Sequence, residues 1–312
     1  GGMFAPINVS AAVDVMGFNY NQQDYDRFHA AHPALPITSS EDISAFQTRG
    51  AWATDASRNI INSDDTEKAS WGASHRAGWK AIAERPFIMG GFVWTVFDYH
   101  GEPTPHVWPS KSSYFGMMDL CGFPKTAFYI HQAHWVKDRP VAVIAPHWNW
   151  AGQEGRSIRV MTITNGDHAR LLLNGKPVAD GPVDRYEMAT FEVPYAAGRL
   201  EMIVTKGGKP HAHTVVETTG TPVALRLTPD PRSLDGDGRD AQPIMVEAID
   251  AKGRAVPTAN LPLTFAITGG RIIGLGNGDP TGQQPSKGNV ESLFNGLAQV
   301  IVQTDAGSSG TL

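Results

Sequence analysis

The chain changes near residue 140 from alternating strand-like and helix-like segments to strand-like segments alone. Upstream of this point the two kinds of segment alternate, at 13–20, 24–33, 35–40, 71–86, 87–99 and 124–139. All eight tryptophans lie at or before residue 150. Alternating strands and helices predict a parallel sheet or a (β/α) barrel, whereas a series of short strands with regular turns predicts a sandwich. The sequence therefore predicts two architectures in one chain.

Proline marks the limits of the expected helices. Helices over 24–33 and 71–86 each end at a proline. Pro124 stands at the first position of a third helix, where its missing N–H leaves no hydrogen bond unmade. The long apolar run at 87–99 predicts a strand that is buried on both faces.

The strand-like part of the chain divides again. Asn174-Gly175 between two apolar runs is a strong short-range signal for a β-hairpin. A polar, glycine-rich break at 230–240 lies inside a second series of strand-like segments. We therefore predict two tandem Ig-like β-sandwiches, over 139–219 and 220–312.

Composition excludes several classes of function. Charged residues make up 18% of the 312 residues and the net charge is −5, which disfavours nucleic acid as a partner. No run of 18 apolar residues is present, so no membrane span is predicted.

Two short motifs do not support a cofactor or metal site. Gly274–Asp279 lacks the glycine spacing of a dinucleotide loop, and the histidines of the His211–His213 stretch have no further ligand pattern. Neither a cofactor nor a metal is predicted.

Polar and aromatic residues follow the strand-like segments of the first part. Asn19-Tyr20 ends one segment, Glu41 ends the next, and the third passes through Trp94 toward Glu102. In a (β/α) barrel the carboxyl ends of the strands form the rim of the active site. A carboxylate can attack an anomeric carbon, and an indole can stack on a sugar ring. Plainer interpretations remain open: an exposed acid at 41, a core indole at 94 and a turn residue at 102.

Three segments resemble glycoside hydrolase family 2, especially its bacterial β-galactosidases. The segment at 92–135 resembles the barrel-closing part of these enzymes, and PITSSEDISAFQTRG at 36–50 resembles the segment that carries the nucleophile. VDVMGFNYN at 13–21 resembles the preceding barrel strand. The resemblance implies that 1–138 is the C-terminal portion of a TIM-barrel catalytic domain, supplying its sixth to eighth strands.

The resemblance also implies roles for individual residues. Glu41 corresponds to the catalytic nucleophile, and Trp94 to the tryptophan beneath the galactose subsite. Glu102 corresponds to an acid that binds sugar hydroxyls. Tyr20 falls where the family places a tyrosine near the nucleophile. Its neighbour Asn19, at the same strand end, is a further candidate for binding the substrate. These roles imply release of terminal β-galactose with retention of configuration.

Two departures from the family pattern affect this expectation. The residues around the nucleophile are Ser39-Ser40-Glu41-Asp42, where the family commonly has Gly-Ser-Glu-Thr. The family carries its general acid/base on an Asn-Glu pair, and these 312 residues contain no such pair. We therefore expect the chain to be the C-terminal part of a longer enzyme, inactive and poorly soluble by itself.

Two other functions stay open at this level. The parent enzyme could act on a related β-glycoside, either a glucuronide or a mannoside. A non-catalytic carbohydrate-binding or adhesive sandwich protein would carry a similar series of strands. A periplasmic or secreted location is expected in preference to the cytoplasm, and the sequence does not indicate an oligomeric state.

Overall fold

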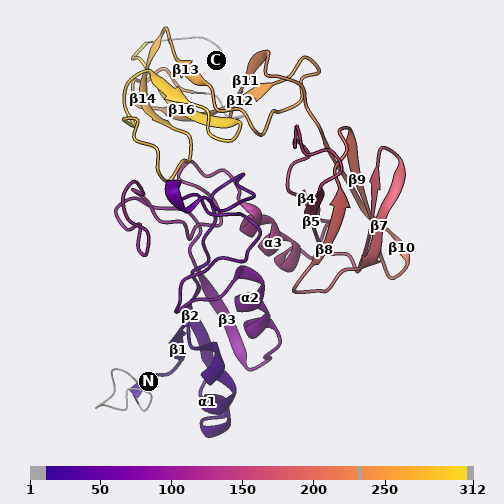
Figure 1. Cartoon of the computed structure of the whole chain (residues 1–312). Coiled ribbons are helices and arrows are strands. Elements are labelled where there is room, and N and C mark those ends of the chain that lie inside the picture. The colour runs from indigo at the N-terminus through magenta and orange to yellow at the C-terminus, as the bar shows by residue number, and fades with distance from the viewer. Residues whose placement is uncertain (1–11, 231–233, 308–312) are drawn as a thin grey trace.

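The computed structural model describes residues 12–230 and 234–307. Its strands form one small parallel sheet and two larger antiparallel groups, which lie apart in space in chain order (Figure 1). The helices α1, α2 and α3 lie in the first 135 residues, as the alternating pattern predicts. No helix within the described ranges is long and apolar enough to cross a membrane.

The first group is a parallel sheet with the order β1-β2-β3. Two helices connect its strands, and their apolar side chains pack with those of the strands around Tyr25 and Ile82. The elements are β1 (Met16–Asn19), α1 (Tyr25–Ala31), β2 (Ile37–Ile43), α2 (His75–Ala83) and β3 (Ile88–Trp94). Short 3-10 turns occupy Gln22–Asp24 and Ala56–Arg58. The parallel β–α order predicted for this part is confirmed.

Strand β3 differs from its prediction. Met89 and Phe92 each expose 69% of their surface, so the strand is not buried on both faces. The reason is that β3 is an edge strand of a sheet with only three strands. The other described residues therefore pack against only part of its surface. Helix α2 also starts later than predicted, at His75, where the Ser74 hydroxyl caps it. Trp71 therefore lies in the preceding loop.

Helix α3 (Thr126–Trp135) joins the parallel sheet to the strands that follow. It begins two residues after Pro124, with Lys125 as its N-cap, so the proline precedes the helix instead of opening it. Ile130 and Ala133 pack into the core of the next sheets, while α3 also contacts α2.

Two antiparallel sheets follow and share one apolar core that includes Trp148 and Leu171. One sheet holds β4 (Ala142–Ala145), β5 (Ser157–Thr164) and β8 (Ala189–Pro194). The other holds β6 (His168–Leu173), β7 (Lys176–Pro182), β9 (Arg199–Lys206) and β10 (Lys209–Glu217). Asn174 and Gly175 form the β6–β7 turn with φ of 51° and 79°, as the hairpin signal predicts.

The last group of strands has its own core, around Val246 and Val300. Its larger sheet holds β11 (Ala224–Pro229), β12 (Ala241–Ile249), β14 (Gly270–Gly276) and β16 (Leu297–Thr304). The smaller sheet pairs β13 (Pro262–Thr264) with β15 (Val290–Ser292). The strand-like runs at 224–229, 243–250, 261–268 and 297–304 predict four of these strands, whereas glycines and polar residues interrupt the pattern of β14 and β15.

Arg49, in the loop that follows β2, forms hydrogen bonds with the last group of strands. Its guanidinium is buried, and its Nε lies 2.5 Å from Oδ2 of Asp119. The same guanidinium donates to the carbonyls of Asn277 and Phe294, each at 2.7 Å. At Gly278 (φ 79°), a Cβ would stand 1.8 Å from Oδ2 of Asp119, so this close approach requires glycine. Both packing and charge therefore fix this contact.

Asp42 is a second buried charge-bearing group, on the helix-covered side of β2. It is 1% exposed, and neither of its carboxylate oxygens has a hydrogen-bond partner within the described ranges. Burial raises the pKa of Asp42 to about 7; the neighbouring Glu41 carboxylate adds to the rise and the nearby Ser39 hydroxyl opposes it. The sheet therefore accommodates this carboxyl best in its neutral form.

Replacing Arg49 by leucine should lower the free energy of unfolding by about 3–5 kcal/mol, because Asp119 would be left buried and without its cation. Urea unfolding of the full natural protein, followed by tryptophan fluorescence, measures the change. Arg27→Leu is the matched control. The Arg27 side chain is 82% exposed in its pair with Asp24, so this substitution should change the free energy of unfolding by less than about 1 kcal/mol. Equal effects of the two substitutions would contradict the assignment.

Asp42→Asn should change how stability depends on pH. Between about pH 4 and pH 7 the folded state holds the Asp42 proton while the unfolded state releases it, so wild-type stability falls as pH rises through this window. The amide cannot ionise, so the variant should lose this decline and gain stability relative to the wild type above pH 7. Thermal melts from pH 4 to pH 8 measure the difference, and parallel curves for the two proteins would refute it.

Candidate functional site

The site lies where the parallel strands end. Tyr20 follows β1 with φ 57°, Ile43 ends β2 with φ 80°, and Ser44 follows β2 with φ 57°. Positive φ is unusual for residues with a Cβ and is rarest for a β-branched residue such as Ile43. Strained backbone of this kind is concentrated at functional sites. These turns bring side chains from the ends of both strands to the same place.

One cavity of about 120 Å³ brings together four of the five site residues that the sequence predicts. Tyr20, Glu41, Trp94 and Glu102 all line it. Five further residues complete its wall: Ser44, Trp71, Tyr99, Thr104 and Phe115. The parallel pairing explains the convergence, because the register places Asn19 beside Glu41 and the end of β2 beside Trp94.

Asn19 lies beside the cavity rather than in its wall. Its amide Nδ2 is 3.5 Å from Oε2 of Glu41, at the outer limit of a hydrogen bond. The Ser40 hydroxyl donates to Oδ1 of Asn19 at 2.6 Å and so fixes which end of the amide faces the carboxylate. Asn19 can therefore orient Glu41.

A phenol bridges the other two predicted residues. Nε1 of Trp94 donates to the Tyr99 hydroxyl at 3.1 Å, and that hydroxyl donates to Oε2 of Glu102 at 3.0 Å. Tyr99 thus sets the orientation of the indole and of the carboxylate together. Tyr99 follows the same strand-like run as Trp94, but the sequence alone assigned it no role in the site.

Both phenols of the site stay protonated at neutral pH. Burial raises the pKa of Tyr20 above its usual value, and the Glu41 carboxylate adds to the rise. Burial and the hydrogen bond to Glu102 raise the pKa of Tyr99 to about 12. The Tyr20 hydroxyl also lies 2.5 Å from Oγ of Ser44. Each phenol can therefore supply an O–H donor close to a carboxylate.

A buried ion pair supports the segment between Trp94 and Glu102. Oδ2 of Asp98 lies 2.6 Å from Nζ of Lys125, and both side chains are almost fully buried. Burial raises the pKa of Asp98 to about 7, while Lys125 opposes the rise. Asp98 does not line the cavity, so its contacts with Lys125 and Gly116 support the cavity wall from behind.

The combination of groups suits a polyhydroxylated, uncharged ligand. Two carboxylates can accept hydrogen bonds from hydroxyl groups, and the Tyr20 hydroxyl can donate one, whereas the Tyr99 hydroxyl already donates to Glu102. Trp71 and Trp94 supply aromatic surface for the apolar face of a sugar ring. The sequence predicts a helix that includes Trp71, so the contribution of this residue to the site was not predicted.

Family models match two parts of the chain. Residues 225–312 match the model described as glycoside hydrolase family 2 C-terminal domain 5. Residues 155–212 match a domain of unknown function. The first match covers the last group of strands, and the second covers most of the preceding pair of sheets.

Curated proteins and solved structures match almost the whole chain. Beta-galactosidase BoGH2A of Bacteroides ovatus is 35% identical over 95% of this chain, which spans 37% of that protein. A beta-glucuronidase of Formosa agariphila is 28% identical over 86% of the chain, which spans 28% of its length. A beta-glycosidase from Bacteroides vulgatus superposes on 95% of the chain with a TM-score of 0.86 and 27% identity, and the chain covers 43% of it. The chain belongs to glycoside hydrolase family 2.

Proposed function

We propose that the protein containing this chain hydrolyses terminal β-galactosides with retention of configuration, using Glu41 as the nucleophile. The convergence of Tyr20, Glu41, Trp94 and Glu102 in one cavity carries this proposal. Relatives named as glycosidases cover nearly all of the chain, which favours an enzyme over a non-catalytic carbohydrate-binding or adhesive protein. No cofactor enters the proposed reaction.

In this mechanism the Glu41 carboxylate attacks the anomeric carbon and forms a covalent glycosyl-enzyme. The Tyr20 hydroxyl and the Asn19 amide lie beside Glu41, where hydrogen bonds from these two groups would orient the carboxylate. A carboxylic acid about 5–5.5 Å from the nucleophile protonates the leaving oxygen and then activates water. The absence of an Asn-Glu pair supports a position for that acid outside these 312 residues.

The remaining groups would bind the sugar. Trp94 would form the floor under the galactose ring, held in place by its hydrogen bond to Tyr99. Glu102 would accept bonds from sugar hydroxyls, with one carboxylate oxygen already occupied by the same phenol. Tyr99 therefore acts as a positioning residue in this scheme.

We further propose that β1, β2 and β3 are the sixth to eighth strands of a (β/α)8 barrel. Their parallel order, with a helix after each of the first two strands, supports this assignment. The exposed Met89 and Phe92 on β3 also support it, because a closed barrel would cover such a surface. Domain limits of 1–138, 139–219 and 220–312 then follow, with Ig-like sandwiches in the last two.

The charge of the cavity favours galactosides over glucuronides. Recognition of a uronate carboxylate calls for a cation, yet the described wall of the cavity contains neither lysine nor arginine. A β-glucuronidase is the second candidate because relatives with that name match the chain. A β-mannosidase is a third, with no observation that favours it.

Glu41→Gln should lower kcat/KM for 4-nitrophenyl β-galactoside by at least about 10⁴-fold in the full natural protein, the scale seen when a catalytic unit is broken. Glu84→Gln, at the exposed end of α2, should leave the rate unchanged. A 2-fluoro-galactoside should label the peptide that contains Glu41. Labelling of a different peptide would refute the assignment of the nucleophile.

A panel of 4-nitrophenyl glycosides should show at least about tenfold higher kcat/KM for the β-galactoside than for the β-glucuronide. The physical reason is that burying a uronate carboxylate without a cation costs free energy. The β-mannoside completes the panel. A preference for the glucuronide would assign the protein to the second function and would place a cation from outside this chain in the site.

A further inference from the structure

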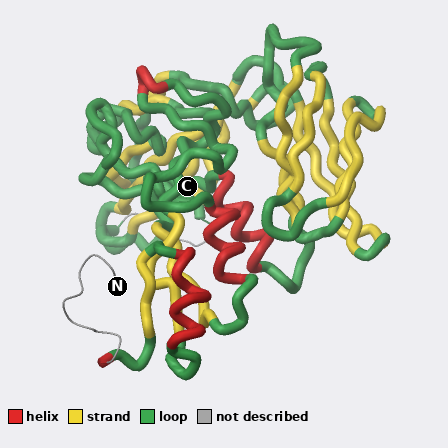
Figure 2. Tube along the Cα trace, turned by 60° about the horizontal axis from the view of Figure 1, so that its bottom comes forward, coloured by secondary structure: helices red, strands yellow, loops and turns green. Residues whose placement is uncertain are grey.

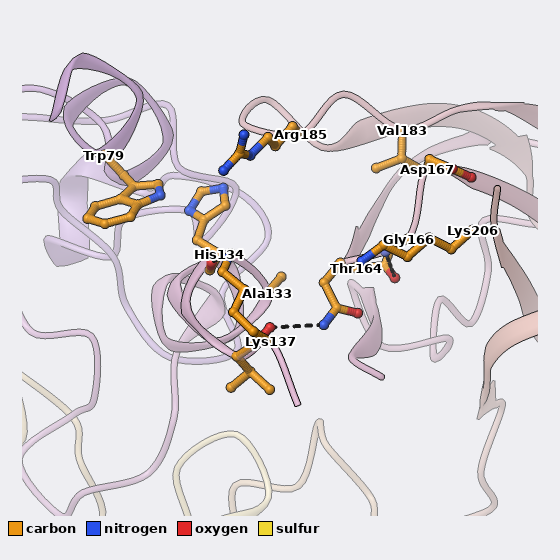
Figure 3. A pocket seen from close by; sticks show the side chains of 12 residues that line it. Trp79, Ala133, His134, Lys137, Thr164, Gly166, Asp167, Val183, Arg185 and Lys206 are labelled. Atoms are coloured by element: carbon orange, nitrogen blue, oxygen red, sulfur yellow. Dashed lines mark hydrogen bonds between the residues drawn. The ribbon is translucent and has the colours of Figure 1, made fainter. Parts of the chain in front are cut away.

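A second and larger cavity lies between the helices and the first pair of antiparallel sheets. Its volume is about 420 Å³, within the range of sites for small molecules. Figure 3 shows Trp79 and His134 on one side, with Asp167 and Lys206 on the other. None of its lining residues lines the cavity that contains Glu41.

Two neutral polar side chains in its wall, those of Asn165 and Thr164, already have partners. The Asn165 amide donates to the carbonyls of Val136 and Arg139, and its oxygen accepts from Val141 N and His211 Nε2. The Thr164 hydroxyl donates to the carbonyl of Val141 and accepts from Gly166 N. These groups have little capacity left for a ligand.

Three cations supply most of the unused hydrogen-bond donors. Lys137 follows α3, Arg185 lies in the loop before β8, and Lys206 ends β9. None of the three forms an ion pair with any described residue; Lys137 donates to the carbonyl of His134, and the Arg185 guanidinium lies over the Tyr186 ring. Burial lowers the pKa of Lys137, and the charges of Arg185 and Lys206 lower it further.

One carboxylate in the same wall partly offsets these cations. Asp167 is the only acid among the lining residues, and its Oδ2 accepts a hydrogen bond from Gly207 N at 2.6 Å. Burial lowers the pKa of His134 to about 4, so that ring is neutral at pH 7. The cavity therefore carries a net positive charge of about two at neutral pH.

The side of the cavity that the helices form is aromatic. Trp79 and His134 lie there with their ring centroids 6.3 Å apart, whereas Val183 lies across the cavity beside Asp167 (Figure 3). A small inorganic anion would leave most of the volume and all of this surface unused. A sugar ring with one anionic substituent would contact both sides.

We propose that this cavity binds a saccharide that carries a carboxylate or sulfate group, with the oxyanion held by Lys137, Arg185 and Lys206. Because the three side chains reach solvent, binding weakens as ionic strength rises. The site is separate from the proposed catalytic site, so it would hold an acidic glycan beside the enzyme without taking part in hydrolysis.

Isothermal titration calorimetry of the full natural protein tests the proposal with galactose 6-sulfate and glucuronate as probes. The double variant Arg185→Gln/Lys206→Gln should weaken their binding at least about fivefold, since each exposed charge contributes modestly. Lys176→Gln, in the exposed β6–β7 hairpin, is the matched control and should bind as the wild type does. Hydrolysis of 4-nitrophenyl β-galactoside should be the same in all three proteins.

Several results of these experiments would overturn the proposal. Equal binding by the wild type and the double variant, or no binding of either probe, would overturn the proposal. Galactose and acetate should bind more weakly than the acidic sugars, and acetate as strong as glucuronate would overturn the saccharide assignment. A change in hydrolysis in the double variant would show that the cavity is not separate from catalysis.

Discussion

The position of the candidate site depends on the buried ion pair between Lys125 and Asp98. Lys125 Nζ also donates to the carbonyls of Gln47 and Tyr114, at 2.8 and 3.3 Å, while Oδ1 of Asp98 accepts from Gly116 N at 2.8 Å. The pair therefore ties together the loop after β2, the segment after β3 and the start of α3. Burying two charges is unfavourable unless further hydrogen bonds satisfy them, and here they do.

This arrangement matters because much of the site is built on loop. Figure 2 shows long loops in the region that precedes the first pair of antiparallel sheets, and α2 and β3 are the main regular elements between β2 and α3. Loops of this length hold a shape only through specific contacts. The Lys125–Asp98 ion pair stabilises the segment that carries Trp94 and Tyr99, and the Arg49–Asp119 ion pair stabilises the segment after Glu41.

Local signals predicted much of the fold. Pro33 limited α1, and Asn174-Gly175 formed the expected hairpin, because such residues act on their immediate neighbours. The exposure of Met89 and Phe92 could not be predicted, since it depends on which strands flank β3. Glu41 and Trp94 were predictable because they lie at strand ends that converge, and Glu102 because it follows the third strand. The bridge that Tyr99 forms between Trp94 and Glu102 depends on side-chain conformations that the sequence does not specify, and Trp71 lies in a loop distant from the strand ends.

The close approach of Gly278 to Asp119 gives the last group of strands a role beyond that of an appended module. The Arg49 guanidinium is neutralised by Asp119, but it is enclosed by carbonyls that belong to residues 277, 294 and 295. Separation of those strands would expose a charged pair only a few residues from Ser44 in the site wall. Folding of the last strands and order in the candidate site are thus thermodynamically coupled, although the two lie more than two hundred residues apart in the chain.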